Sequence, residues 1–334
     1  MKSNNLGIYR CPITIQELEI SVLEEIDGGI VSANLSNQNS DYFEIRNGVP
    51  DFTWPKELSS IEQETRNEYE EIATIYDSIA DFPFKTFNEN EEVVRNQMID
   101  KLNINPGDKV LEVGCGSGRG SEIIAERLKG NGLLVLQDLS SSFLNEAIKK
   151  LKNSEVNIEF SLASACYLPF PDNFFDAAHH FGGLNVFGDI KRALAELARV
   201  VKPGGKILVG DESIAPWLRN TDFGKIVMNA NPMYSHQIDM ELLPTNAANV
   251  KLEWIMKGSF YTIEFTVSES LEPVANFDIP IPGKRGGTFN KRYFGVLEGI
   301  DPHIKAKLYS EAQLLNLSVV DYLELLLKQN KNVE

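Results

Sequence analysis

The chain has 334 residues, 43% of them hydrophobic and 24% charged, which is enough to bury a sizeable core in two or three packed units. Its formal net charge of −16 weighs against nucleic acid as a partner, because phosphate binding depends on Lys and Arg. The first residues contain no apolar stretch of signal-peptide length and no run of about 20 apolar residues follows, so we expect a cytoplasmic protein without a membrane span.

Residues 1–58 are expected to form a small β module without a metal. Short apolar segments alternate with turn signals such as Asn47-Gly48, and two prolines interrupt any helix. The cysteines of the whole chain lie far apart and share no metal-ligand spacing, which indicates reduced thiols. They are Cys11, Cys115 and Cys166.

Residues 59–105 are predicted to be a helical lid or linker. The helical period begins near Ser60, a candidate N-cap, with Glu62 and Glu64 in the first turn where carboxylates suit the helix dipole. A second helix is expected over 89–102, and it leads into a turn built on Pro106-Gly107.

Residues 106–268 alternate between apolar strands and amphipathic helices. This alternation predicts a doubly wound α/β domain, in which a parallel sheet is covered on both faces and binds its ligand at the carboxyl ends of the strands. An antiparallel hairpin around Lys257-Gly258 is expected to finish the sheet. The expected strands are 109–114, 132–138, 158–163, 175–181 and 206–212, and the expected helices are 121–129, 141–152 and 189–201.

Residues 269–334 are predicted to form a linker and a C-terminal appendage. A stretch rich in Pro and Gly precedes a strand-like segment, 291–299, and two helices, 301–316 and 318–329. Pro302 suits a first helical position, and Ser318 with Asp321 gives a capping-box-like start.

The segment "LEVGCGSGRG" at 111–120 is the strongest chemical signal in the chain. Glycine is needed where a strand-to-helix turn takes positive φ or touches a ligand. The spacing of Gly114, Gly116 and Gly118 departs from the dinucleotide pattern, because Arg119 stands where its third glycine would lie. The Glu112 carboxylate would repel a pyrophosphate and would suit a cationic ligand, which argues against a nicotinamide-dependent oxidoreductase.

Four segments in order resemble the class I S-adenosylmethionine-dependent methyltransferases, over about residues 70–265. They are "VLEVGCGSGRG", "LQDLS", "ASACYLPFPDNFFD" and "RVVKPGGKILVGDE". The resemblance implies a Rossmann-like methyltransferase sheet with S-adenosylmethionine as cofactor. It is nearest to small-molecule enzymes such as the quinone-biosynthesis methyltransferases.

The resemblance also implies the residues that hold this cofactor. Asp138 would bind both ribose hydroxyls, and Ala165 would contact the adenine. Ser164 stands where the family has Asp, so its hydroxyl would accept from the adenine amino group more weakly, or it is an ordinary loop residue. Tyr76 would cover the cofactor, or only pack on an amphipathic helix. The full expected set is Tyr76, Glu112, Gly114, Cys115, Gly116, Gly118, Asp138, Leu139, Ser164, Ala165 and His180.

Two adjacent histidines end the fourth expected strand of the domain. Alternation puts His179 and His180 on opposite faces, and we expect His180 to face the cofactor as a general base, or else only to wall the pocket. The reaction implied is in-line displacement at the sulfonium methyl group, aided by alignment and desolvation.

Both ends of the chain carry weaker resemblances. The first 58 residues look like a zinc-ribbon-like domain that accompanies some RNA and protein methyltransferases, but Thr14 stands in the second cysteine position, which excludes a four-thiolate zinc site there. The end of the chain resembles a ribbon-helix-helix unit, which would pair two subunits or pack on the methyltransferase domain; DNA binding is disfavoured by the net charge.

The sequence thus predicts methyl transfer to a small metabolite or peptide, at an O-, N- or C-nucleophile. An RNA-modifying methyltransferase is the first alternative, and a basic surface would favour it. The second is a cofactor-binding scaffold subunit that has lost catalysis, although the glycine turn and Asp138 argue against that loss.

Overall fold

The computed structural model describes residues 1, 3–283, 286–294, 297 and 299–329. The chain divides into two compact units, Met1–Pro273 and Val274–Glu334. In the described residues no helix is long and apolar enough to cross a bilayer.

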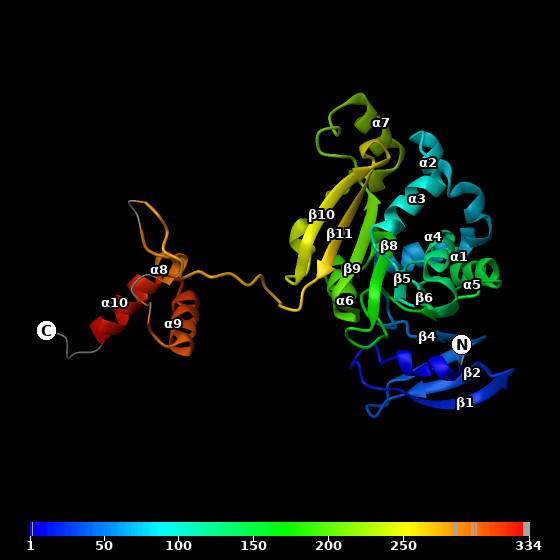
Figure 1. Cartoon of the computed structure of the whole chain (residues 1–334), viewed down its shortest axis with the longest axis horizontal. Helices are drawn as coiled ribbons and strands as arrows, with labels where there is room; N and C mark the ends of the chain where they lie inside the picture. Colours follow the sequence, from blue (N-terminus) through cyan, green and yellow to red (C-terminus); the bar gives the residue numbers. More distant parts are fainter. Residues whose placement is uncertain (2, 284–285, 295–296, 298, 330–334) are drawn as a thin grey trace. The chain divides into compact units, whose positions relative to one another are not determined.

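The first unit is built on one sheet of eleven strands, whose order is β1-β2-β3-β4-β7-β6-β5-β8-β9-β11-β10. Figure 1 shows the N-terminal strands in blue along one end of this sheet. The strands are β1 (Glu19–Ile26), β2 (Gly29–Ser36), β3 (Tyr42–Arg46), β4 (Val49–Asp51), β5 (Lys109–Val113), β6 (Leu133–Asp138), β7 (Asn157–Leu162), β8 (Phe175–Phe181), β9 (Val201–Glu212), β10 (Ala247–Ile255) and β11 (Phe260–Val267).

The strand order places a ligand site between β5 and β8. From β5 the chain moves outward to β6 and β7, and then returns to β8 on the other side of β5. The strands from β7 to β9 are parallel, while β11 runs antiparallel to both β9 and β10. The expected α/β sheet with an antiparallel final hairpin is therefore confirmed, and its switch in strand order opens a crevice at the carboxyl ends.

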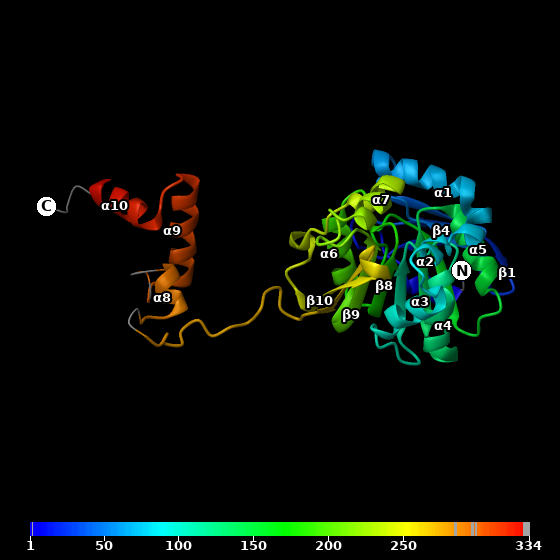
Figure 2. The same cartoon turned by 90° about the horizontal axis from the view of Figure 1, so that it is seen from above.

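Helices cover both faces of this sheet. One core cluster joins strand residues such as Leu134 and Leu208 to α3, α4 and α5, and another joins Leu111 and Val209 to α6. Figure 2 shows α1 beside α5 and α3 beside α4. The helices are α1 (Ser60–Ile79), α2 (Phe82–Thr86), α3 (Glu91–Asp100), α4 (Arg119–Leu128), α5 (Ser141–Leu151), α6 (Ile190–Val200), α7 (Asp222–Ala230), α8 (Phe289–Phe294), α9 (Pro302–Leu314) and α10 (Val319–Gln329).

The N-terminal strands continue the same sheet. β4 pairs in parallel with β7 through Asp51 and Leu162, and the Phe52 N–H donates to the Leu162 carbonyl at 2.8 Å. The Tyr9 ring lies 5.1 Å from that of Phe52 and 5.8 Å from that of Phe170, measured between centroids. The first 58 residues therefore share one core with the domain that follows, while their resemblance to a zinc-ribbon-like domain stays a prediction.

The second unit is helical where a strand was expected. The segment predicted to be a strand over 291–299 begins inside α8 (Phe289–Phe294), and residues 295, 296 and 298 lie outside the described part. The strand prediction was wrong because Thr288 acts as a cap: its Oγ1 accepts from the Lys291 N–H at 3.0 Å. The expected cap of α10 is confirmed, since Ser318 Oγ accepts from the Asp321 N–H at 3.1 Å.

Candidate functional site

A cavity lies at the carboxyl ends of β5 to β8, roofed by α1. Nine of the eleven residues predicted to hold a cofactor line it: Tyr76, Glu112, Gly114, Cys115, Gly116, Asp138, Leu139, Ala165 and His180. Gly118 and Ser164 do not line it. Helix α1 and the strand ends thus bring Tyr76 and His180, which are 104 positions apart in the sequence, to one cavity.

The glycine turn after β5 has the backbone that its sequence predicts. Gly114, Gly116 and Gly118 have φ values of 62°, 54° and 83°, a region that favours glycine. Gly118 is the N-cap of α4, and a Cβ there would lie 3.2 Å from that of Ala147. Gly118 therefore permits close packing of α4 on α5, which explains why it does not reach the cavity.

Asp138, the last residue of β6, is buried and fixed by backbone donors. Its Oδ2 accepts from the Gly116 N–H at 2.8 Å, and its Oδ1 accepts from the Ser140 N–H at 2.9 Å. Burial raises the pKa of this carboxyl to about 6. Each oxygen keeps a further lone pair, so the ionised carboxylate can accept from a ligand hydroxyl.

Glu112, on β5, is a second buried carboxylate of the cavity. It accepts from the Ser121 hydroxyl and from His179 Nδ1, the latter at 3.1 Å. A Cβ at position 120 would lie 2.6 Å from Glu112 Oε1, so only a glycine leaves this carboxylate its place. Its acceptor character suits a cationic or amino ligand group.

Both histidines of β8 line the cavity, so the expectation that only one would face it was wrong. His180 Nδ1 donates to the Val113 carbonyl at 2.7 Å, and burial lowers the pKa of the His180 ring below 6.5. Because a carbonyl can only accept, the neutral ring carries its proton on Nδ1. Nε2 is then a buried lone pair without a hydrogen-bond partner among the described residues.

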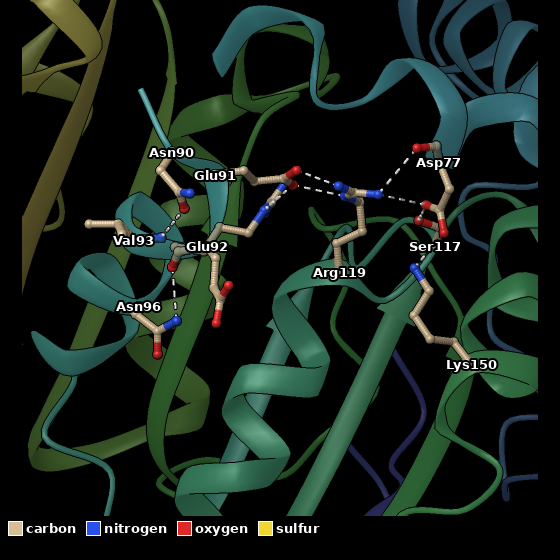
Figure 3. Close-up of polar contacts among 10 residues, drawn as sticks. Asp77, Asn90, Glu91, Glu92, Val93, Asn96, Ser117, Arg119 and Lys150 are labelled. Atoms are coloured by element: carbon tan, nitrogen blue, oxygen red, sulfur yellow. Dashed lines mark hydrogen bonds and ion pairs between the residues drawn. The ribbon is translucent and has the colours of Figure 1, made fainter. Parts of the chain in front are cut away.

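The roof helix α1 is fastened to the glycine turn by charged contacts. Figure 3 shows Arg119 between Glu91 of α3 and Asp77 of α1. Arg119 Nε donates to Glu91 Oε1 at 2.8 Å, and its Nη1 donates to the Asp77 carbonyl at 3.3 Å. Asp77 also accepts from Ser117 and from Lys150 Nζ, the latter at 2.6 Å. Helix α1, the lid helix, is therefore bound directly to the glycine turn.

Aromatic rings and a cap hold the middle of α1. Tyr76 meets Phe143 edge-on, with ring centroids 4.9 Å apart, and Tyr69 lies 5.1 Å from the same ring. Glu70 accepts from the Ser141 N–H at 2.6 Å at the start of α5. Tyr76 thus lines the cavity and packs on a neighbouring helix, so both alternatives drawn from the sequence describe it.

Ser164 is hydrogen-bonded to a residue of the lid helix α1. Its hydroxyl donates to Glu62 Oε1 at 2.7 Å, and Glu62 lines the cavity. Sequence reasoning had placed Glu62 in the first turn of α1 only as a favourable charge. The N-cap is Ser59 rather than Ser60, and the pattern Ser59-x-x-Glu62 was the sequence signal of a capping box that marks this turn.

Comparison with known proteins agrees with this geometry. Residues 110–205 match the methyltransferase domain family. This segment is a methyltransferase domain. A domain of this class uses S-adenosylmethionine as its methyl donor.

Curated relatives match about a third of the chain. A ubiquinone/menaquinone biosynthesis C-methyltransferase UbiE of Francisella philomiragia is 40% identical over 117 residues, which is 34% of this chain and 47% of the relative. The UbiE of Chromobacterium violaceum is 37% identical over 131 residues, 39% of this chain and 49% of the relative. The chain therefore spans about half the length of these relatives.

Solved structures align with part of the chain at low identity. A putative S-adenosyl-L-methionine-dependent methyltransferase from Methanococcus maripaludis aligns with a TM-score of 0.45 and 19% identity, covering 60% of this chain and 94% of that one.

Proposed function

We propose that the whole chain transfers a methyl group from S-adenosylmethionine to a small metabolite or a peptide. The observation that carries this proposal is the pair of buried carboxylates, Glu112 and Asp138, on either side of a glycine turn at the switch point of the sheet. Such a pair of carboxylates repels phosphate and accepts hydrogen bonds from an ammonium group and from ribose hydroxyls. S-adenosylmethionine supplies, when bound, a methyl group on a positively charged sulfur.

The proposed binding roles follow from the contacts of each residue. Asp138 would accept from the ribose hydroxyls and Glu112 from the amino group of the cofactor. Gly114 and Gly116 would let the backbone approach the ligand, and Tyr76 would close over it. Cys115, Leu139 and Ala165 would supply apolar walls, while Gly118 and Ser164 would act through their neighbours.

We propose His180 as the group that receives the acceptor's proton. His180 lines the cavity, its Nε2 is buried without a hydrogen-bond partner among the described residues, and its tautomer is fixed by the Val113 carbonyl. The Phe187 ring packs against the imidazole, with centroids 4.6 Å apart. A base held in this way needs no reorganisation before it accepts a proton. Since the matched relatives are named C-methyltransferases, carbon acceptors are the first to test.

The proposal is tested by calorimetric titration of the purified full chain with S-adenosylmethionine, S-adenosylhomocysteine and NAD. Micromolar binding of the two sulfur nucleotides and none of NAD is the expected result. Incubation with methyl-labelled cofactor and fractionated small-molecule extracts then identifies the acceptor by the label it gains. Binding of NAD alone, or of none of the three, would contradict the proposal.

We further propose that the second unit pairs two copies of the chain. Its helices α9 and α10 expose large apolar side chains, among them Leu314 and Val320, which are 84% and 65% exposed. The full chain is expected to elute as a dimer in light-scattering chromatography, and a chain ending at Pro273 as a monomer. A monomeric full chain would contradict the pairing.

A further inference from the structure

We propose that Glu62, in the first turn of the lid helix, accepts a hydrogen bond from the 6-amino group of the cofactor's adenine and thereby selects an aminopurine. The inference rests on the proposed function. It moves recognition of the base from the loop after β7 to a residue of α1, 102 positions earlier in the chain than Ser164.

Glu62 is a buried carboxylate that is held at both oxygens. It is 8% exposed, yet it lines the cavity. Its Oε1 accepts from the Ser164 hydroxyl and its Oε2 from the Ser59 hydroxyl, each at 2.7 Å. Each oxygen keeps a lone pair. No lysine or arginine within the described residues forms an ion pair with this carboxylate, so its charge is open to a ligand donor.

The surroundings of Glu62 are shaped to hold it there. A Cβ at position 188 would lie 2.4 Å from Glu62 Oε2 and 2.8 Å from Ser59 Oγ, so the glycine at 188 leaves the carboxylate its space. Ser164 Oγ accepts from the Cys166 N–H at 3.2 Å, which directs its own proton toward Glu62. Ser164 is thus a positioning residue, and the carboxylate that it orients is the one that reaches the cavity.

The three carboxylates of Glu112, Asp138 and Glu62 lie at three neighbouring strands of the sheet. Glu112 belongs to β5 and Asp138 to β6, while Glu62 is bound to the loop that follows β7. Since adjacent strands lie about 4.8 Å apart, the outer two strands are about 10 Å apart. S-adenosylmethionine carries its donor groups in a matching order along the molecule: the ammonium, the ribose hydroxyls and the adenine amino group.

A carboxylate at the base end selects by the direction of the hydrogen bond. An amino group donates to Glu62, whereas a keto oxygen at the same position of the purine would face it with lone pairs. A ligand with the keto group loses this charge-assisted bond and places an oxygen lone pair against the buried carboxylate. Discrimination of about tenfold to a hundredfold in affinity is expected from such a bond.

The test compares S-adenosylhomocysteine with S-inosylhomocysteine, in which a keto oxygen replaces the amino group, by calorimetry on the full chain. The wild type is expected to bind the adenine form at least about tenfold more tightly, and Glu62→Gln to reduce this ratio to about threefold or less. Because the readout is a ratio of two ligands on one protein, partial unfolding of a variant does not imitate the effect.

Matched variants isolate the role of Glu62. Glu68→Gln removes a carboxylate from an exposed position of the same helix and is expected to keep the wild-type ratio. Ser164→Ala should lower the ratio less than Glu62→Gln does, since it removes only the orienting donor. The double variant E62Q/S164D places a carboxylate on the loop instead and is expected to restore the preference for the amino form.

The outcomes separate this inference from the proposed function. A wild type that binds both ligands equally, or a Glu62→Gln variant that discriminates as well as the wild type, overturns the role of Glu62 while the function stands. A wild type that binds neither ligand overturns the proposed function and this inference with it. A reduced ratio in Glu62→Gln, with an unchanged ratio in Glu68→Gln, supports it.

Discussion

Asp138→Asn is the substitution whose effect follows most directly from the geometry. The Asp138 carboxylate is buried, and each oxygen already accepts one backbone N–H at 2.8–2.9 Å. Asn keeps the shape but removes the charge and turns one oxygen into a donor that faces a backbone N–H. Loss of charge-assisted bonds to the ribose hydroxyls should weaken cofactor binding by roughly 1.5–3 kcal/mol or more, which is about tenfold to a hundredfold or more.

The pKa of Asp138 adds a pH signature to this loss. Burial raises it to about 6 in the free protein, so below that pH the carboxyl is neutral and must lose its proton to accept fully. The affinity of the wild type for S-adenosylhomocysteine should fall by up to about tenfold per pH unit below 6. The Asn variant should lack this component, and calorimetry between pH 5 and 8 measures both proteins.

The pH dependence of the unfolding free energy, measured without ligand, is an independent check on the pKa of Asp138. Because folding raises this pKa from 3.8 to about 6, the contribution of Asp138 to stability is fully present below about pH 4 and is lost as the pH rises through 6. The unfolding free energy of Asp138→Asn relative to wild type should therefore rise by up to about 3 kcal/mol over that window. An Asn variant with wild-type affinity at every pH would refute the ribose role.

Three further predictions concern the base, the lid and the turn. Once an acceptor is found, His180→Gln should lower kcat by about a hundredfold to ten-thousandfold with little change in cofactor affinity. Because burial lowers the pKa of His180, wild-type activity should hold to below pH 6.5. An unchanged kcat in the variant would refute the role of His180 as the base. Arg119→Ala should weaken cofactor binding and speed limited proteolysis of α1, whereas Arg46→Ala, at an exposed position, should change neither. Equal rates of cleavage in the two variants would count against the contact of Arg119 with α1. Gly118→Ala should lower the free energy of unfolding by about 1–3 kcal/mol, because φ is 83° and the new Cβ meets Ala147. Gly130→Ala, with open space around it, should be nearly neutral in the same thermal unfolding measurement. Equal shifts of the melting temperature in the two variants would contradict the packing argument.

The sequence predicted the parts of the site that lie within one local pattern. The glycine turn, Asp138 and the strand ends follow from hydrophobic runs and turn chemistry, so their positions could be read residue by residue. The neighbour of Ser164 could not, because the hydrogen bond to Glu62 joins residues 102 positions apart and depends on how α1 lies over the sheet. The roles of the site residues themselves stay predictions.

Two errors show how local chemistry can mislead. The segment beginning at Lys291 was predicted to be a strand, but the Thr288 cap three positions earlier starts a helix there. Alternation along β8 predicted that one histidine would leave the cavity. The glycine at position 120 leaves Glu112 room beside His179, and both His179 and His180 line the cavity.

The joint between β4 and β7 governs the order in which this protein can complete its fold. Strands β1 to β4 leave the ribosome before β7, because their partner Leu162 follows Asp51 by 111 positions, and Phe170 arrives later still. Closing so long a loop is slow relative to local pairing. The apolar faces of the first four strands must therefore wait for the centre of the chain. Deleting residues 1–58 would also remove the Tyr9 ring from Phe170, which in turn packs against Phe175, rather than release an independent module.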